Sequence, residues 1–174
     1  GLYNRAYFAE EVRRLDSGRH YPVSLIMCDL DGLKLVNDAL GHEAGDRLIL
    51  EAANVLRSGV REDDVVARVG GDEFAILIAH TSPRDVIQIV NRIKDLIDQH
   101  NKSHELPLSI SMGYATTTNK NKSIDELYCE ADSNMYKYKL DNRQQSNQKI
   151  MRMLKKIYIS KDFGKEGHLE RIGH

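Results

Sequence analysis

The chain has 174 residues, which is enough for one domain with a substantial hydrophobic core and a short appendage. Its formal net charge of -1 gives no basic field for nucleic acid, and no apolar run reaches membrane-spanning length. Cys28 and Cys129 are isolated, so we expect both to be buried free thiols in a reducing, cytoplasmic compartment. A chain that starts at Gly1 without an initiator methionine, and that shows no signal peptide, is typical of a fragment of a larger protein.

The hydrophobic periodicity alternates between that of strands and that of helices, which predicts an α+β fold. Helix starts are marked by Ser82 with Pro83 and by a capping box at residues 123–126. Helices are expected over residues 5–15, 41–56, from Ser82 onward and from Ser123 to about Asn142, and strands over 23–30, 65–78 as a hairpin, and 107–118. Residues 144–148 are interpreted as a polar linker before an amphipathic helical stretch over 150–159.

An almost unbroken apolar run over residues 23–28 ends in Asp29, and Asp31 and Gly32 follow. Such a run is expected for a central strand that is covered on both faces. A carboxylate at the end of a buried strand is costly unless its charge is compensated, and hard oxygen ligands suit Mg²⁺. We therefore interpret Asp29 as a metal ligand. Asp31 fits either a metal ligand or a residue that caps the segment after it.

Residues 68–74 read Arg-Val-Gly-Gly-Asp-Glu-Phe and join two strand-like runs. Gly70 and Gly71 can take positive φ at both central positions of a tight turn, and they let a ligand approach the backbone closely. Asp72 and Glu73 then start the returning strand, so two carboxylates are held beside the turn. The alternative interpretation is a hairpin with a solvated acidic tip.

Together these segments resemble the GGDEF domain, the catalytic module of diguanylate cyclases, with motifs in order from about Leu2 to about Arg143. The matching residues are Asn4-Arg5, Asp29-Leu30-Asp31, Lys34, Asn37-Asp38, Gly41-His42, Gly45-Asp46, Arg61–Asp64, Arg68–Phe74, Ser109–Gly113, Ala131-Asp132, Tyr136, Lys139 and Arg143. The resemblance implies a palm-like antiparallel sheet of the ferredoxin-like, nucleotidyl-cyclase type, with helices on one face. It assigns residues 1–145 to this domain.

Diguanylate cyclases condense two GTP into cyclic di-GMP and two pyrophosphates, by in-line attack of a 3′-hydroxyl on an α-phosphate. By resemblance, Asp29, the carbonyl of Leu30, Asp72 and Glu73 hold two Mg²⁺ ions, for which Mn²⁺ can substitute. Asp72 and Glu73 are the implied catalytic pair, and Asp72 is the candidate acceptor of the hydroxyl proton. The division of labour between the two carboxylates stays open.

The residues that the resemblance assigns to GTP are Gly32, Leu33, Lys34, Asn37, His42, Asp46, Gly70, Gly71, Lys139 and Arg143. The backbone amides of Gly32 and Leu33 are expected to bind phosphate, although the family often has other residues at positions 32 and 33. The cations Lys34, Lys139 and Arg143 are expected to bind phosphate as well. Lys139 and Arg143 share a helix face, where solvated cations are also common. Asp46 can accept both N1–H and N2–H of guanine and so favours GTP, unless it only caps a helix.

Arg61 and Asp64 match the RxxD inhibitory site, at which the family binds its product cyclic di-GMP. As a string RxxD is common, and the alternative is a surface ion pair. Each domain binds one GTP, so the resemblance implies that turnover requires a homodimer with two facing half-sites. The competing hypothesis is a catalytically silent module that senses GTP or binds cyclic di-GMP.

The tail ends in Gly167–His174, which resembles the opening of an HD-type metal-dependent phosphohydrolase domain. Residues 146–174 are therefore interpreted as a linker helix and the start of a truncated HD domain. An artefactual or disordered end is the alternative.

Overall fold

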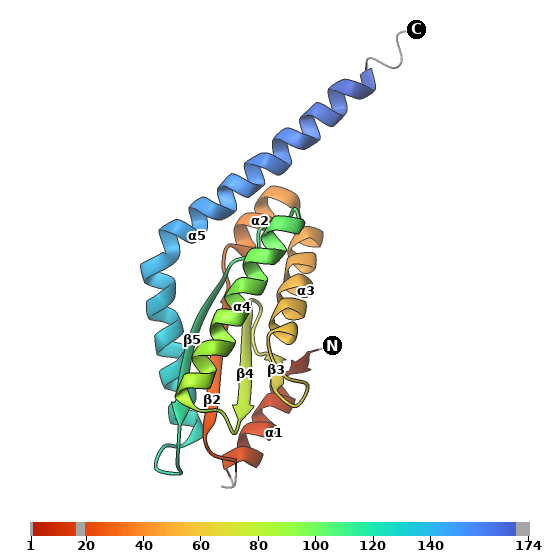
Figure 1. Ribbon diagram of the computed structural model, residues 1–174. Coiled ribbons are helices and arrows are strands. Elements are labelled where there is room, and N and C mark those ends of the chain that lie inside the picture. The colour runs from red at the N-terminus through yellow and green to blue at the C-terminus, as the bar shows by residue number, and fades with distance from the viewer. Residues whose placement is uncertain (1, 17–19, 170–174) are drawn as a thin grey trace.

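The computed structural model describes residues 2–16 and 20–169, with side chains described as far as Ser160 (Figure 1). Its helices are α1 (Arg5–Asp16), α2 (Leu33–Leu40), α3 (His42–Ser58), α4 (Pro83–Ser103) and α5 (Ile124–Leu169). Its strands are β1 (Tyr3–Asn4), β2 (Val23–Leu30), β3 (Val65–Arg68), β4 (Glu73–Ala79) and β5 (Ile110–Thr117). Among the described residues, no helix is both long and apolar enough to cross a membrane.

The strands form a single sheet in the order β1-β3-β4-β2-β5. β2 lies between β4 and β5 and pairs antiparallel with both, and β3 pairs antiparallel with β4. The predicted antiparallel pairing is therefore confirmed for the four longer strands. β1 adds a parallel edge next to β3, and its two residues are too few to produce a strand pattern in the sequence.

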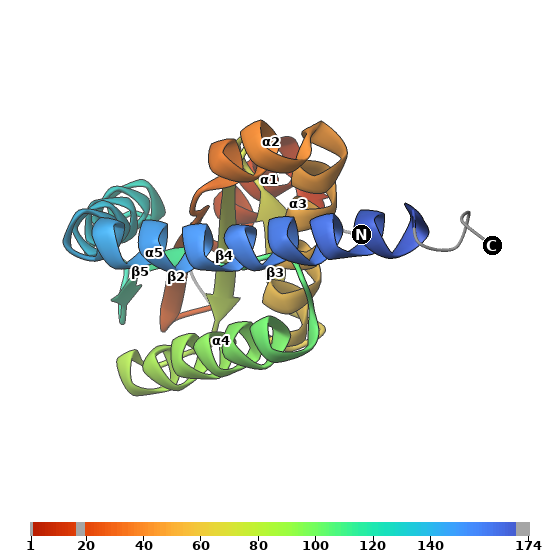
Figure 2. The ribbon, with the colours of Figure 1, turned by 90° about the horizontal axis from the view of Figure 1, so that it is seen from above.

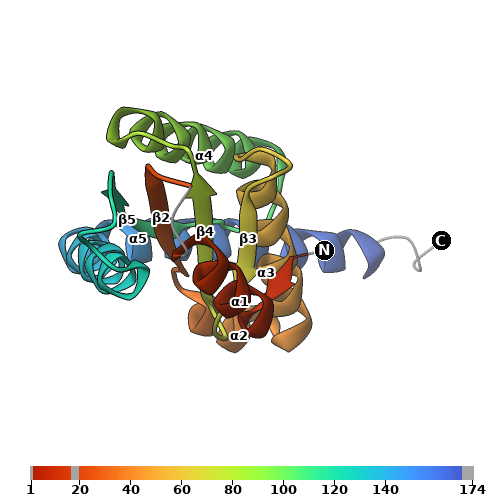
Figure 3. The ribbon, with the colours of Figure 1, turned by 90° about the horizontal axis from the view of Figure 1, so that it is seen from below.

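Helices cover both faces of the sheet, as the two end views show (Figures 2 and 3). Along β2, Ile26 and Cys28 pack on one face with α3 and α4, whereas Leu25 and Met27 pack on the other with α1 and the first half of α5. The expectation of helices on one face only is wrong. The unbroken apolar run of β2 is the better guide, because alternate side chains of a strand point to opposite faces.

The two cysteines differ in environment. Cys28 is buried in β2, and burial raises the pKa of its thiol far above the ordinary value. Cys129 is exposed on α5, so the prediction of a second buried thiol is wrong. Leu127 and Ala131, two residues to either side, turn into the core, which leaves Cys129 on the outer face of the helix.

The helix α2 has no counterpart among the predicted elements. It has eight residues and lies between Gly32 and Gly41, whose φ angles are 70° and 89°. Glycine tolerates such positive φ values, so the chain can change direction sharply at both ends of the helix. A helix this short depends on tertiary packing, here of Val36, and not on intrinsic propensity.

The last helix is much longer than expected. Residues 144–148, interpreted as a linker, lie inside α5, which continues through the predicted helical stretch at 150–159. Polarity alone does not end a helix, and the sequence has no glycine or proline between Ser123 and Phe163. Figure 1 shows that α5 changes direction along its length, so its first half follows β5 and its second half crosses the end of the sheet.

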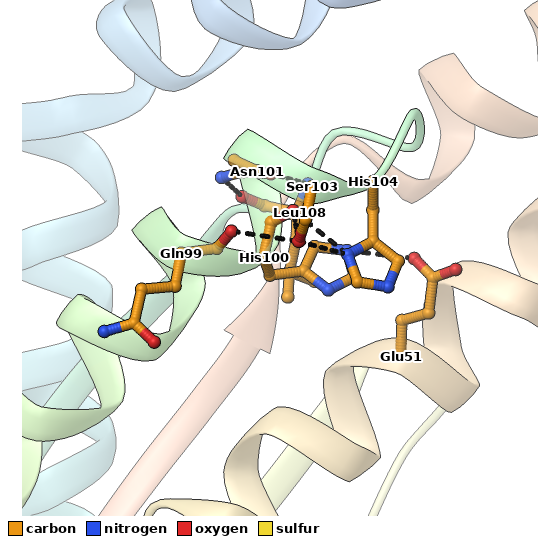
Figure 4. A network of polar contacts seen from close by, with 7 residues as sticks. All are labelled: Glu51, Gln99, His100, Asn101, Ser103, His104 and Leu108. Carbon is orange, nitrogen blue, oxygen red and sulfur yellow. Dashed lines mark hydrogen bonds and ion pairs between the residues drawn. The ribbon is translucent and has the colours of Figure 1, made fainter.

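At the contact between α3 and the end of α4, two histidine rings are stacked (Figure 4). His100 is buried, and its ring centroid lies 4.0 Å from that of His104. Its Nε2 lies 3.1 Å from Oε2 of Glu51, but the two atoms are not aligned as a hydrogen bond. Burial and the neighbouring His104 lower the pKa of His100, against the opposing effect of Glu51.

We therefore expect the free energy of unfolding to decrease as the pH is lowered below about 6.5, the usual pKa of histidine. In that range the unfolded chain binds a proton at His100 that the folded chain resists, so acid favours unfolding. His100→Gln should flatten this dependence between about pH 7.5 and about pH 5, as measured by urea unfolding. The same change at the exposed His42 is the control. Equal slopes for the wild type and His100→Gln would contradict the assignment.

Candidate active site at the carboxyl end of β2

The end of β2 and the start of β4 bring the acidic residues together. Asp29 is paired in register with Glu73 across the two strands, and with Ser111 of β5 on the other side. The backbone N–H of Leu30 donates to the carbonyl of Asp72 at 2.8 Å. Asp29, Leu30, Asp72 and Glu73 therefore lie at one end of the sheet, as the sequence predicts.

Lys139 of α5 reaches this acidic end. Its Nζ donates to Oδ1 of Asp29 at 2.6 Å, with only 9% of the Asp29 side chain exposed. Burial raises the pKa of Asp29, the charges of Asp72 and Asp31 act in the same direction, and Lys139 opposes them. Burial alone lowers the pKa of Lys139, but the bond to Asp29 and the nearby carboxylates raise it overall. Lys139, which the sequence predicts to bind phosphate, is thus held in its charged form beside the acidic residues.

Asp31 is held by Ser111 of β5 and by Ser109, the residue before β5. Its two carboxylate oxygens accept from the hydroxyls of Ser109 and Ser111, both at 2.8 Å. The position before α2 is Gly32, which makes no side-chain cap, so the interpretation of Asp31 as a helix cap is wrong. Asp31 instead joins the exit of β2 to the entry of β5, next to the backbone bond from its N–H to the carbonyl of Ser109.

The hairpin tip differs in detail from the expected tight turn. The connection between β3 and β4 runs over residues 69–72, and neither Gly70 nor Gly71 has positive φ. Arg68 holds the tip, because Nε donates to the carbonyl of Gly70 at 3.2 Å and Nη2 to that of Gly71 at 2.7 Å. A Cβ at Gly70 would collide with the Glu73 carboxylate, whereas Gly71 faces open space. The glycine at position 70 therefore leaves room for the end of the flexible Glu73 side chain, and the turn itself does not require positive φ there.

The chemistry of the acidic end suits a divalent cation. Among the residues that the structure describes, no three histidine, cysteine, aspartate or glutamate side chains converge closely enough to hold a metal ion. The Glu73 carboxylate lies over Gly70. Asp29, Asp31 and Asp72 nevertheless bring three carboxylates near Lys139, and the charges of Asp72 and Asp31 contribute to the raised pKa of Asp29. Hard oxygen donors with excess negative charge fit Mg²⁺.

The residues expected to bind the base lie on α2 and at the start of α3. Oδ1 of Asn37 is buried and has no hydrogen-bond partner among the described residues. It fits against Gly45, where any Cβ would collide with the carboxamide. A buried acceptor without a partner costs about 1–3 kcal/mol, so Asn37 is prepared for a ligand that donates a hydrogen bond. His42 and Asp46 are exposed in the first turns of α3.

The remaining phosphate candidates are on the surface. Lys34 is exposed at the start of α2, after Gly32 and Leu33. Arg143 is exposed on α5, one helical turn beyond Lys139. The structure therefore brings Lys139 directly into the acidic end and leaves Lys34 and Arg143 at its rim.

The RxxD motif forms a tight turn before β3. The buried carboxylate of Asp64 accepts the backbone N–H of Arg61 at 2.8 Å, and burial raises the pKa of Asp64. Arg57 of α3 fastens the same turn through the carbonyls of Asp64 and Glu62, both at 2.7 Å. The side chain of Arg61 is left exposed beside it. The described ion pairs do not include one between the side chains of Arg61 and Asp64, and the inhibitory role of this motif stays a prediction.

Several residues of the site are not assigned a role by the sequence argument. They are Arg68 at the hairpin tip, Ser109 and Ser111 on Asp31, and two residues of α5, Ser146 and Ile150. Arg68 lies two residues before Gly70 and could have been found as a turn-stabilising cation. The others act across long sequence separations, for which a single sequence gives no signal.

Comparison with known proteins agrees with this arrangement. The family model described as "Diguanylate cyclase, GGDEF domain" matches residues 1–145. Over 122 residues the chain is 38% identical to the bifunctional diguanylate cyclase/cyclic di-GMP phosphodiesterase MucR of Pseudomonas aeruginosa, covering 69% of this chain and 18% of MucR. The solved GGDEF domain of YfiN (TpbB) from the same organism is 31% identical, with a TM-score of 0.68 over 81% of this chain and 92% of that one. A microbial GGDEF domain solved with cyclic di-GMP is 29% identical, with a TM-score of 0.66 over 79% and 88% of the two chains.

The chain therefore belongs to the GGDEF domain family, and the palm-like fold is confirmed. It spans a small part of the curated relatives, 18% of MucR in one case. The family match ends at residue 145. The HD interpretation of the tail stays a prediction, because residues 170–174 and the side chains from 161 onward lie outside what the structure describes.

Proposed function

We propose that this chain is a diguanylate cyclase domain that condenses two GTP into cyclic di-GMP with release of two pyrophosphates. The observation that carries the proposal is the meeting of Asp29, Asp72 and Glu73 at one end of the sheet, with Lys139 Nζ 2.6 Å from Asp29. Carboxylates and a charged amine at one point provide for both metal and phosphate, the two requirements of phosphoryl-group transfer. Membership of the GGDEF family supports it.

Each residue then has a chemical task. Two Mg²⁺ ions held by Asp29, the Leu30 carbonyl, Asp72 and Glu73 would activate the 3′-hydroxyl and stabilise the leaving oxygen, and Mn²⁺ can replace them. Asp72 accepts the hydroxyl proton. Lys139 exchanges its bond to Asp29 for a phosphate oxygen. One domain holds one GTP, so a homodimer with facing half-sites is needed for both bonds of the product.

The direct test is incubation of the dimeric protein with GTP and Mg²⁺, followed by separation of the nucleotides. Cyclic di-GMP and pyrophosphate are the expected products. The competing function is a silent module that senses GTP or binds cyclic di-GMP. Absence of product from a verified dimer that still binds GTP would establish that alternative.

Asp46→Ser should relax the selectivity for GTP over ATP. The Asp46 carboxylate can accept both donors on the guanine edge, whereas a serine hydroxyl cannot accept two at once. Loss of this contact is expected to reduce discrimination by ~10-fold, since a hydrogen bond to a charged acceptor contributes about 1.5–3 kcal/mol. Competition between GTP and ATP in one reaction measures the ratio. Unchanged exclusive use of GTP would assign the discrimination to Asn37 instead.

Arg61→Ala should weaken inhibition by the product without changing the initial rate. The Arg61 side chain is exposed, and the turn itself is held by backbone bonds and by Arg57, so the fold of this segment should survive. Early turnover is expected to match the wild type, while the late decline caused by cyclic di-GMP fades. Arg84→Ala, an exposed arginine on α4, is the matched control. Equal calorimetric affinity of Arg61→Ala and wild type for cyclic di-GMP would place the inhibitory site elsewhere.

A further inference from the structure

The helix α5 contacts the exit of β2 at three points along its length. Lys139 contacts Asp29. The hydroxyl oxygens of Ser146 and Ser109 are 3.4 Å apart, and Ser109 donates its proton to Asp31. Residues 139, 146 and 150 are spaced by seven and four, so they lie along one face of the helix. The third member of this series, Ile150, contacts Gly32.

The contact between Ile150 and Gly32 is close. Ile150 is fully buried, and its Cδ1 lies 2.5 Å from the point where a Cβ on Gly32 would stand. Gly32 has φ 70° and ψ 18°, and its carbonyl accepts the first backbone bond of α2, from Val36 at 3.1 Å. The side chain of Ile150 therefore rests directly on the backbone from which α2 starts.

Hydrophobic burial keeps this part of α5 in place. Ile150, Leu154 and Ile157 are buried in the same cluster as Leu30 and Val36, which lie on either side of Gly32 in the sequence. The ion pair between Lys149 and Asp98 of α4 adds little, because its atoms are 3.4 Å apart and both side chains are about half exposed. Figure 2 shows this half of the helix running across the end of the sheet between α2 and α4.

We propose that Ile150 is a positioning residue for the triphosphate of GTP, acting through the backbone of Gly32. The inference rests on the proposed function and on the expectation from the sequence that the amides of Gly32 and Leu33 bind the phosphates. The side chain of Ile150 packs against the backbone of Gly32 and thereby fixes the position and orientation of the turn before α2. The second half of α5 therefore forms part of the substrate site without touching the substrate. Truncation of the Ile150 side chain changes the affinity for GTP while leaving Asp72 and Glu73 in place.

The test is a double-mutant cycle between positions 32 and 150. Gly32→Ala adds the Cβ that meets Ile150 and forces a side chain into positive φ, so it should weaken binding by ~10-fold or more. Ile150→Val removes only Cδ1, the atom nearest to that Cβ. The double variant is therefore expected to bind several-fold more tightly than Gly32→Ala alone, with the rest of the loss remaining as backbone strain.

Binding is measured by calorimetry with α,β-methylene-GTP and Mg²⁺, so the readout does not depend on turnover. Ile150→Ala should weaken this binding by ~3- to 10-fold and raise the KM for GTP, with little change in kcat. Leu154→Ala, one turn further in the same cluster, is the matched control and should leave the affinity unchanged at a similar loss of stability. Failure of Ile150→Val to restore any affinity to Gly32→Ala, or equal weakening by Leu154→Ala, would overturn the inference. If the wild type does not bind the analogue at all, the proposed function fails as well, which separates the two failures.

Discussion

Asp72→Asn and Glu73→Gln should each abolish the proposed synthesis of cyclic di-GMP while the domain stays folded. Both changes keep the shape of the side chain and remove its charge. Loss of a proton acceptor or of an anionic metal ligand lowers turnover by ~100- to 10,000-fold. The start of β4 is held by backbone pairing, and its partner Asp29 lies in register with Glu73, so the sheet does not depend on either carboxylate.

Stability gives an independent check on this prediction. The charge of Asp72 is one cause of the raised pKa of Asp29, so removing it relieves repulsion. The melting temperature of Asp72→Asn should therefore equal or slightly exceed that of the wild type. Pyrophosphate release and thermal unfolding measure the two effects, and Asp95→Asn on the exposed side of α4 is the control. Turnover close to the wild type in either variant would remove that residue from the catalytic assignment.

The sequence predicts the acidic end well because strands and carboxylates there are encoded locally. The apolar run of β2 and the two runs around residues 70 and 71 fix the strands, and register then brings Asp29 beside Glu73. Turn chemistry is less readable. Neither Gly70 nor Gly71 takes the positive φ expected of a tight turn, and Gly70 instead leaves room for the Glu73 side chain, which no dipeptide pattern expresses.

Long-range contacts account for most of what the sequence does not predict. Asp31 and Ser111 are 80 positions apart, and either residue alone fits several roles. Ile150 reads only as one apolar residue of an amphipathic helix, and its contact with Gly32 depends on how α5 changes direction. The helix itself is misjudged at residues 144–148, because polar side chains suit an exposed helix as well as a linker.

Gly113→Ala should destabilise the domain strongly. Gly113 is buried in β5 opposite Met27, and a Cβ there would collide with the backbone N of Met135 and lie 2.5 Å from the carbonyl of Ala131. These atoms belong to the backbone of α5 and cannot rotate away. The gain in strand propensity from alanine is about 0.5–1 kcal/mol and is smaller than the expected overpacking cost of ~3 kcal/mol.

The melting temperature of Gly113→Ala is therefore expected to fall by ~6–12 °C, and GTP affinity should fall with it, because Lys139 lies one turn beyond Met135. Gly71→Ala is the control: its Cβ meets open space and its φ is not positive, so its stability should change by less than about 0.5 kcal/mol. Adding Met135→Ala to Gly113→Ala should give no rescue, since the collision is with backbone. This outcome is the opposite of the one expected at Gly32, where Ile150 meets the added Cβ with a side-chain atom and Ile150→Val relieves it. Recovery of the melting temperature in Gly113→Ala/Met135→Ala would show that a side chain, and not the path of α5, requires glycine in β5.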